Sequence, residues 1–100
     1  MSGLKIINTD SRDEVNQASV DFIERCLLIL EHVFHQSQDV RMAFHMWINN
    51  LRISEPHSYM LLHEDPLYIS ARYVGIDPMQ VHSGNYDRDY KILAKQRGWL

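Results

Sequence analysis

The feature that most constrains the fold is a long run of apolar residues at helical spacing near the N-terminus. These residues recur every three or four positions with polar residues between them: Val15, Ala18, Phe22, Ile23, Cys26, Ile29, Leu30, Val33 and Phe34. With Asp10 or Ser11 as the cap, the pattern predicts a helix that ends near His35, about 37 Å long at 1.5 Å per residue. A compact domain of 100 residues has a radius of gyration of only about 13 Å. The helix must therefore cross the whole molecule or project from it.

A second helix is predicted from a cap at Ser37 or Asp39 to about Ile53, and it is apolar on two faces. One stripe contains most of its large side chains: Val40, Ala43, Phe44, Trp47, Ile48 and Leu51. The other stripe lies on roughly the opposite side, at 100° per residue: Met42, Met46 and Ile53. A helix with two apolar faces is either buried between layers or covers another chain. We therefore expect a homodimer that forms through the first two helices, with the second stripe as its interface.

Start and stop signals divide the rest of the chain into short helices. Ser54-Glu55-Pro56 opens one that fades at His63-Glu64, and Asp65-Pro66 starts another that Gly75 ends. Asp77-Pro78 repeats the start signal, and Ser83-Gly84-Asn85 ends that helix after barely two turns. A last helix is expected from Tyr86 to Arg97, with Gly98 as its stop.

Residues 1–9 read as an extended N-terminal arm, and no segment shows the period-two alternation of a strand. The predicted fold is all-α: a single domain over residues 1–100, built as a small bundle of five or six helices. It has a long first helix and a helix-turn-helix-like corner near the C-terminus.

Composition is that of an ordinary globular protein, with 45% hydrophobic and 23% charged residues. The single cysteine, Cys26, excludes an internal disulfide framework and a cysteine-based zinc site, and its apolar neighbours predict a core position. No signal peptide and no apolar run of about 20 residues is visible, so we expect a soluble cytoplasmic protein without a membrane partner.

Catalysis and cofactor binding are not expected. His32 and His35 stand three residues apart beside Glu31, but no histidine pair has a zinc-protease spacing, so no metal site is predicted. Glu64 and Asp65 are adjacent, and adjacent helical side chains point about 100° apart, so they do not form a converging acid–base pair. We name no catalytic residue and no cofactor.

The corner carries the clearest functional pattern. Ala71 is followed four residues later by Gly75, and Val81 follows six residues beyond the glycine. A small residue allows close helix approach, glycine permits a positive φ in a tight turn, and the aliphatic residue anchors the second helix. Over residues 66–84 this spacing resembles the helix-turn-helix motif of DNA-binding proteins, at superfamily level. Gly84 departs from the motif, which has a further apolar anchor there, so an ordinary helical corner remains the alternative.

The resemblance implies a DNA-binding transcriptional regulator in which the helix starting at Pro78 reads the major groove. Base contacts would come from its exposed face: Met79, Gln80, His82 and Ser83. Phosphates of double-stranded DNA would be held by nearby cations: Arg72, Arg88 and Lys91.

The charge distribution leaves two functions open. Residues 66–100 carry a net charge of +2, which suits a nucleic-acid site, whereas residues 1–65 carry −5. The acidic part and the methionine-containing stripe favour a different protein, a small helical adaptor or inhibitor that binds a protein partner and no DNA.

Overall fold

The structure, a computed structural model, describes residues 2–51 and 63–100, with side chains from residue 17 onward. The described residues contain four complete α-helices and one complete 3₁₀ turn, and none of them lies in a strand, which confirms the all-α class. The elements are α1 (Ser2–His32), α2 (Gln38–Asn50), α3 (Pro66–Tyr73), the 3₁₀ turn η2 (Pro78–Gln80) and α4 (Gly84–Arg97). Five or six helices were expected, and the one predicted after Ser54 falls mostly outside the described residues.

The first helix is longer than its sequence pattern predicted. α1 begins at Ser2, so residues 2–9 continue the helix and do not form the expected extended arm. No proline or glycine occurs between Leu4 and Glu55, and nothing in the sequence therefore interrupts the helix before Asp10. α1 has 31 residues and a length of about 46 Å.

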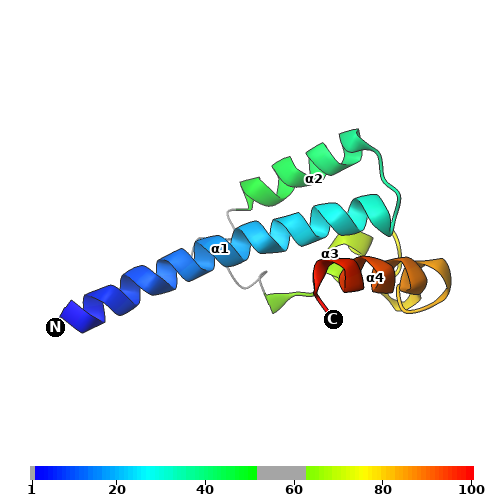
Figure 1. Ribbon diagram of the computed structural model, residues 1–100. Coiled ribbons are helices and arrows are strands. Elements are labelled where there is room, and N and C mark those ends of the chain that lie inside the picture. Colours follow the sequence, from blue (N-terminus) through cyan, green and yellow to red (C-terminus); the bar gives the residue numbers. More distant parts are fainter. Residues whose placement is uncertain (1, 52–62) are drawn as a thin grey trace.

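The long helix makes the molecule elongated. Figure 1 shows the N-terminal half of α1 extending beyond the other helices, which gather around its C-terminal half. The radius of gyration is 15.4 Å and the extents are 54 × 28 × 23 Å. Of the two expected arrangements, projection is the one observed. Among the described helices, none is both long enough and apolar enough to cross a membrane.

α1 ends in a tight turn, at His32 and so slightly before the end near His35 that the sequence predicted. The helix stops at His32, and His35 adopts the left-handed conformation with φ 53°. The backbone N–H of Gln36 donates to the carbonyl of Leu30 at 2.8 Å and closes the turn. Glycine usually occupies this left-handed position, so a histidine there gave no stop signal.

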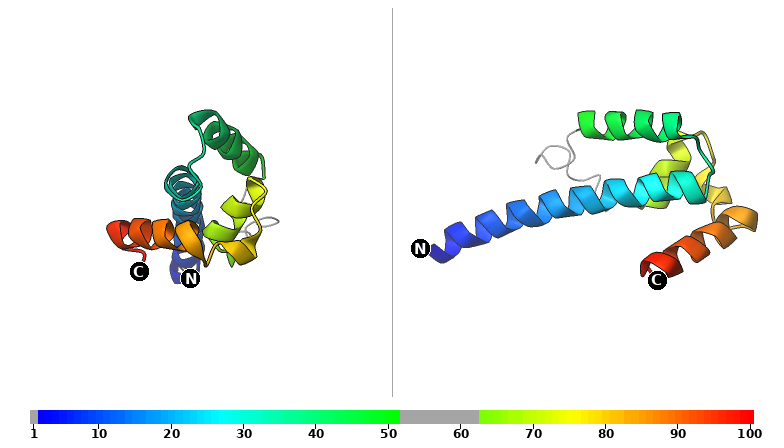
Figure 2. Two further views of the ribbon diagram at one scale, coloured as in Figure 1. Left: turned by 90° about the vertical axis from the view of Figure 1, so that its right-hand side faces the viewer. Right: turned by 45° about the horizontal axis from the view of Figure 1, so that its top comes forward.

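α2 runs back alongside α1 (Figures 1 and 2). Its N-cap is Ser37, as predicted, because the Ser37 Oγ accepts from the N–H of Val40 at 3.3 Å. Arg41 donates to the Gln36 carbonyl at 2.9 Å and pairs with Glu31 of α1 at 3.7 Å. The helix ends at Asn50, earlier than expected.

One core joins the four α-helices. Its members are fully or almost fully buried: Phe22, Cys26, Ile29, Leu30, Val33, Phe34, Phe44, Ile48, Leu67, Ile69, Ala71, Val81 and Leu93. Where α1 and α3 meet, α3 presents the small buried residues Ser70 and Ala71, and the Ser70 Oγ donates to the Cys26 carbonyl at 3.4 Å. Burial raises the pKa of the Cys26 thiol to about 12, so Cys26 is an unreactive core residue, as predicted.

Two candidate interaction surfaces

The corner between α3 and η2 has the backbone geometry that its sequence pattern predicted. Gly75 has φ 78°, in the left-handed region, and follows the C-terminal end of α3. Ala71 and Val81 are both fully buried, on either side of the turn. The N–H of Ile76 donates to the Ala71 carbonyl at 2.9 Å and closes the turn.

The helix expected to follow the corner is absent. Pro78–Gln80 forms a single 3₁₀ turn, so the prediction of a two-turn helix ending near Ser83 is wrong. The Asp77 carboxylate caps this turn by accepting from the Met79 N–H at 2.9 Å. Ser83 then takes an extended conformation, with φ −137°, and α4 begins at Gly84, two residues before the expected Tyr86. The next helix therefore starts before the segment can complete a second turn.

The four residues expected to contact bases all lie exposed on this short connection. Met79 is 83% exposed, and Gln80, His82 and Ser83 are exposed as well. Two of them already have partners inside the corner. The Tyr68 hydroxyl lies 2.6 Å from the Nε2 of His82, and the Ser83 Oγ donates to the Gln80 carbonyl at 3.1 Å.

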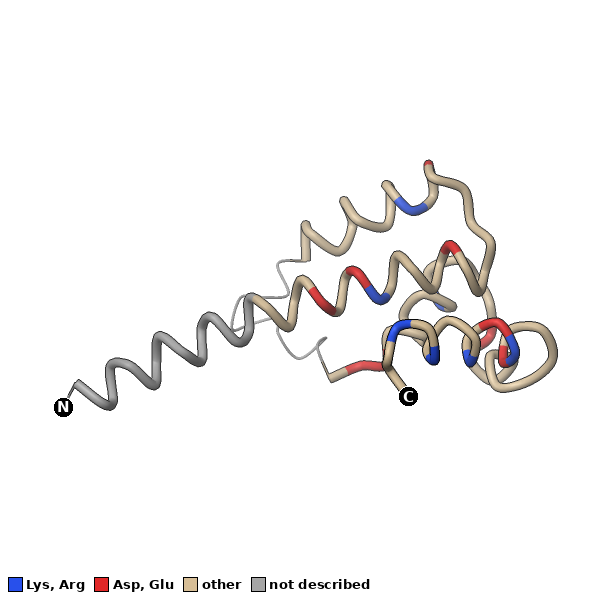
Figure 3. The backbone as a smooth tube through the Cα atoms, in the orientation of Figure 1, with Lys and Arg blue, Asp and Glu red and all other residues tan. Residues whose placement is uncertain are grey.

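The three cations expected to hold phosphates differ in their surroundings. Arg72 is exposed in the last turn of α3. On α4, the Nε of Arg88 lies 3.1 Å from Asp89, and the Nζ of Lys91 lies 2.9 Å from Asp87. Basic and acidic residues consequently alternate along the N-terminal part of α4 (Figure 3). Asp87 and Lys91 stand four residues apart, and this spacing is itself a sequence signal for their pairing.

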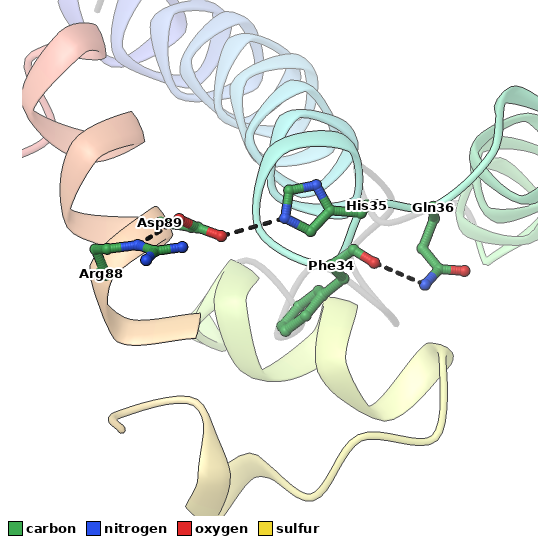
Figure 4. Close-up of polar contacts among 5 residues, drawn as sticks. All are labelled: Phe34, His35, Gln36, Arg88 and Asp89. Atoms are coloured by element: carbon green, nitrogen blue, oxygen red, sulfur yellow. Dashed lines mark hydrogen bonds and ion pairs between the residues drawn. The ribbon is translucent and has the colours of Figure 1, made fainter. Parts of the chain in front are cut away.

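Asp89 also attaches α4 to the end of α1. The Nε2 of His35 donates to the Asp89 Oδ2 at 3.2 Å, and Figure 4 shows the Asp89 carboxylate between His35 and Arg88. In the same turn, the Gln36 side chain donates to the Phe34 carbonyl at 2.9 Å. The hydrogen bond from His35 and that from Arg88 lower the pKa of Asp89 below its ordinary value of 3.8.

This lowered pKa predicts a loss of stability in acid. Because folded Asp89 binds a proton less readily than unfolded Asp89, its contribution is complete above about pH 4 and disappears as pH falls through the folded pKa. Replacing Asp89 with asparagine should make urea unfolding less dependent on pH below about pH 4. His35→Ala should reproduce part of this change, because it removes the largest cause of the shift. Equal pH dependence in all three proteins would contradict the assignment.

The second candidate surface is the outer face of α2, defined here by Met42 and Met46. Phe44 and Ile48 are fully buried on the inner side of the helix. Met46 is two residues from each of them, which places it on the opposite side. Met42 is 56% exposed and Met46 is 67% exposed, whereas Ile53, the third residue of the predicted stripe, lies outside the described residues.

The inner stripe of α2 is only partly buried. Ala43 is exposed, and Trp47 is 41% exposed at the edge of the helix. The Trp47 ring lies 5.3 Å from that of Tyr73, and both contact Phe44, at 5.7 and 5.0 Å between ring centroids. These ring contacts join α2 to α3, and among the described residues none covers the outer methionines of α2.

Beyond its first turn, which contains Asp39, the outer face of α2 carries no charged residue. The sequence contains no aspartate, glutamate, lysine or arginine between Arg41 and Arg52. Figure 3 shows charged residues only in the first part of α2, whereas charges of both signs occur on α1 and α4. The polar residues on this part of α2 are neutral amides and a histidine, and all are exposed: His45, Asn49 and Asn50.

Comparison of the chain with protein-family models, with curated proteins and with solved structures gives no match. The two surfaces are therefore compared by their geometry. The corner presents polar side chains on a three-residue turn, next to cations paired with carboxylates. The outer face of α2 presents two exposed methionines on a helix of 13 residues.

Proposed function

We propose that the protein is a small protein-interaction module, acting as an adaptor or inhibitor, that binds its partner with the outer face of α2. The observation that carries the proposal is the exposure of Met42 and Met46 on a helix whose other side is anchored in the core. Methionine side chains are flexible and polarisable, so they adapt well to a partner surface. Complete burial of one such side chain contributes about 1.5–3 kcal/mol.

DNA binding at the corner is the competing proposal, and the geometry gives it less support. A groove-reading helix must present several side chains along its length to successive base pairs. η2 has three residues, and the carboxylates beside Arg88 and Lys91 would repel DNA phosphates. The exposed amide of Gln80 is the feature that favours this alternative, since glutamine can bind adenine bidentately.

A gel-shift experiment on mixed-sequence duplex DNA at two salt concentrations tests the DNA-binding alternative. We expect no salt-dependent shift. A DNA-binding protein would lose affinity steeply as salt rises, because it displaces counterions from the phosphates. Gln80→Ala would then cost about 1–3 kcal/mol at one base pair, and Lys91→Ala would weaken binding to every sequence. Such a pattern would replace our proposal with the DNA-binding one.

The proposed protein binding is tested by pull-down from nuclease-treated extracts with three baits: the wild type, Met46→Glu and Gln80→Ala. Met46→Glu places a charge at the centre of the outer face, and Gln80→Ala changes an exposed residue of the corner. Proteins that bind the wild type and Gln80→Ala but not Met46→Glu would support the proposal, and further copies of the chain itself count among them. Retention of every partner by Met46→Glu would contradict it.

A further inference from the structure

We infer that the occupant of the α2 outer face is a second copy of this chain, with the two α2 helices packed antiparallel about a two-fold axis that passes between Met42 and Met46. The inference rests on the proposed function, because it names the partner of that same surface. In this arrangement Met42 of one copy lies near Met46 of the other. Residues i and i+4 share a helix face, so each pair of methionines forms a continuous apolar strip.

The charge distribution favours a second copy. A two-fold interface brings a surface patch against the same patch of the other subunit, so a charged patch would repel itself. The outer face carries no formal charge from residue 42 to residue 51 and meets itself without repulsion. By contrast, α1 exposes Asp21, Glu24 and Glu31 among its cations, and residues on α4 alternate in sign. A strongly acidic or basic partner would find no opposite charge on this part of α2.

The polar residues that border the methionines are also able to pair with their own kind. An asparagine side chain has both donors and an acceptor, so an amide can pair with another amide across a two-fold axis. Asn49 and Asn50 are exposed on α2 and can make such contacts. At the other end of the helix, the Asp39 carboxylate is exposed in the first turn. Antiparallel packing brings it toward these amides of the second copy, where it can accept hydrogen bonds.

The size of the surface sets the strength of the dimer. α2 has 13 residues and is about 20 Å long. One face of such a helix is small beside the roughly 800 Å² per partner of a standard stable interface. We therefore expect a reversible dimer with a Kd on the order of 10–100 µM.

Sedimentation of the purified full chain across this concentration range, combined with charge complementation, tests the inference. The wild type should move from 11.8 kDa toward twice that mass as concentration rises. Met46→Glu and Met46→Lys should each remain monomeric, because each places like charges on both sides of the axis. An equimolar mixture of the two variants should dimerise again, because opposite charges then meet.

Met79→Glu is the matched control, because it gives an exposed methionine of the corner the same charge and should leave dimerisation unchanged. Circular dichroism should show that every variant keeps its helix content. A wild-type mass of 11.8 kDa throughout would overturn the inference. Dimerisation of Met46→Glu alone, or a mixture that stays monomeric, would do the same. None of these results contradicts the proposed function, which is contradicted instead by salt-dependent binding to DNA or by retention of every other bound protein in the Met46→Glu variant.

Discussion

Replacing Phe44 with alanine should lower the free energy of unfolding by about 3–5 kcal/mol, the usual cost of removing a buried aromatic ring. Phe44 is fully buried between α2 and the rest of the core, and its ring makes an edge-to-face contact with Tyr73 at 5.0 Å. Truncation removes that contact and the contact between Phe44 and the Trp47 ring, and it leaves a cavity under α2. Small domains have only about 5–15 kcal/mol of stability in total, so this loss would be a large part of it.

Urea unfolding followed by circular dichroism gives the measurement, and Met46→Ala is its matched control. Met46 lies on the same helix but on the outer face, and its truncation in the monomer should change the free energy of unfolding by at most about 0.5 kcal/mol. Equal losses for the two variants would mean that the inner and outer faces of α2 are assigned wrongly.

A second large effect is expected from enlarging Ala71. Ala71 is fully buried on α3, next to the buried Ser70 that donates to the backbone of α1. A leucine at this position has to displace its neighbours, since protein interiors are close-packed and Ala71 is fully buried. Ala71→Leu should therefore destabilise the protein by about 1–3 kcal/mol.

Ala43→Leu provides the comparison for this substitution, because Ala43 is exposed on α2 and has room for a larger side chain. Leucine is nearly as good a helix former as alanine, so the change at residue 43 should stay within about 0.5 kcal/mol. If Ala71→Leu were as well tolerated as Ala43→Leu in thermal unfolding, α3 would not approach α1 as closely as described.

The parts of the fold that the sequence predicted are those with local chemical signals. Asp65-Pro66 starts α3, as its carboxylate accepts from the N–H of Leu67 at 2.9 Å, and Gly98 ends α4 with φ 74°. Glycine at a left-handed position and aspartate at a cap act within a few residues, so sequence reasoning can find them. The outer methionines of α2 were found in the same way, from a helical period of 3.6 residues.

The remaining features depend on competition between neighbouring helix starts or on contacts between residues far apart in the sequence. Pro78 follows a good cap, but α4 starts at Gly84 and leaves space for only one turn, which the start signal alone does not reveal. His35 ends α1 in a left-handed conformation while its side chain contacts Asp89, a residue 54 positions away. The ion pair between Arg88 and Asp89 likewise places a carboxylate beside one of the cations that were predicted to bind phosphate.

The most direct test of the account is a ¹³C-methyl methionine NMR spectrum recorded over a range of protein concentrations and then with added duplex DNA. The chain has five methionines, among them Met42 and Met46 on the outer face of α2 and Met79 at the corner. We expect the signals of Met42 and Met46 to shift as concentration rises, because their methyl groups enter the interface, and the Met79 signal to stay constant in both series. A Met79 signal that shifts with DNA while those of Met42 and Met46 respond to neither series would contradict the account.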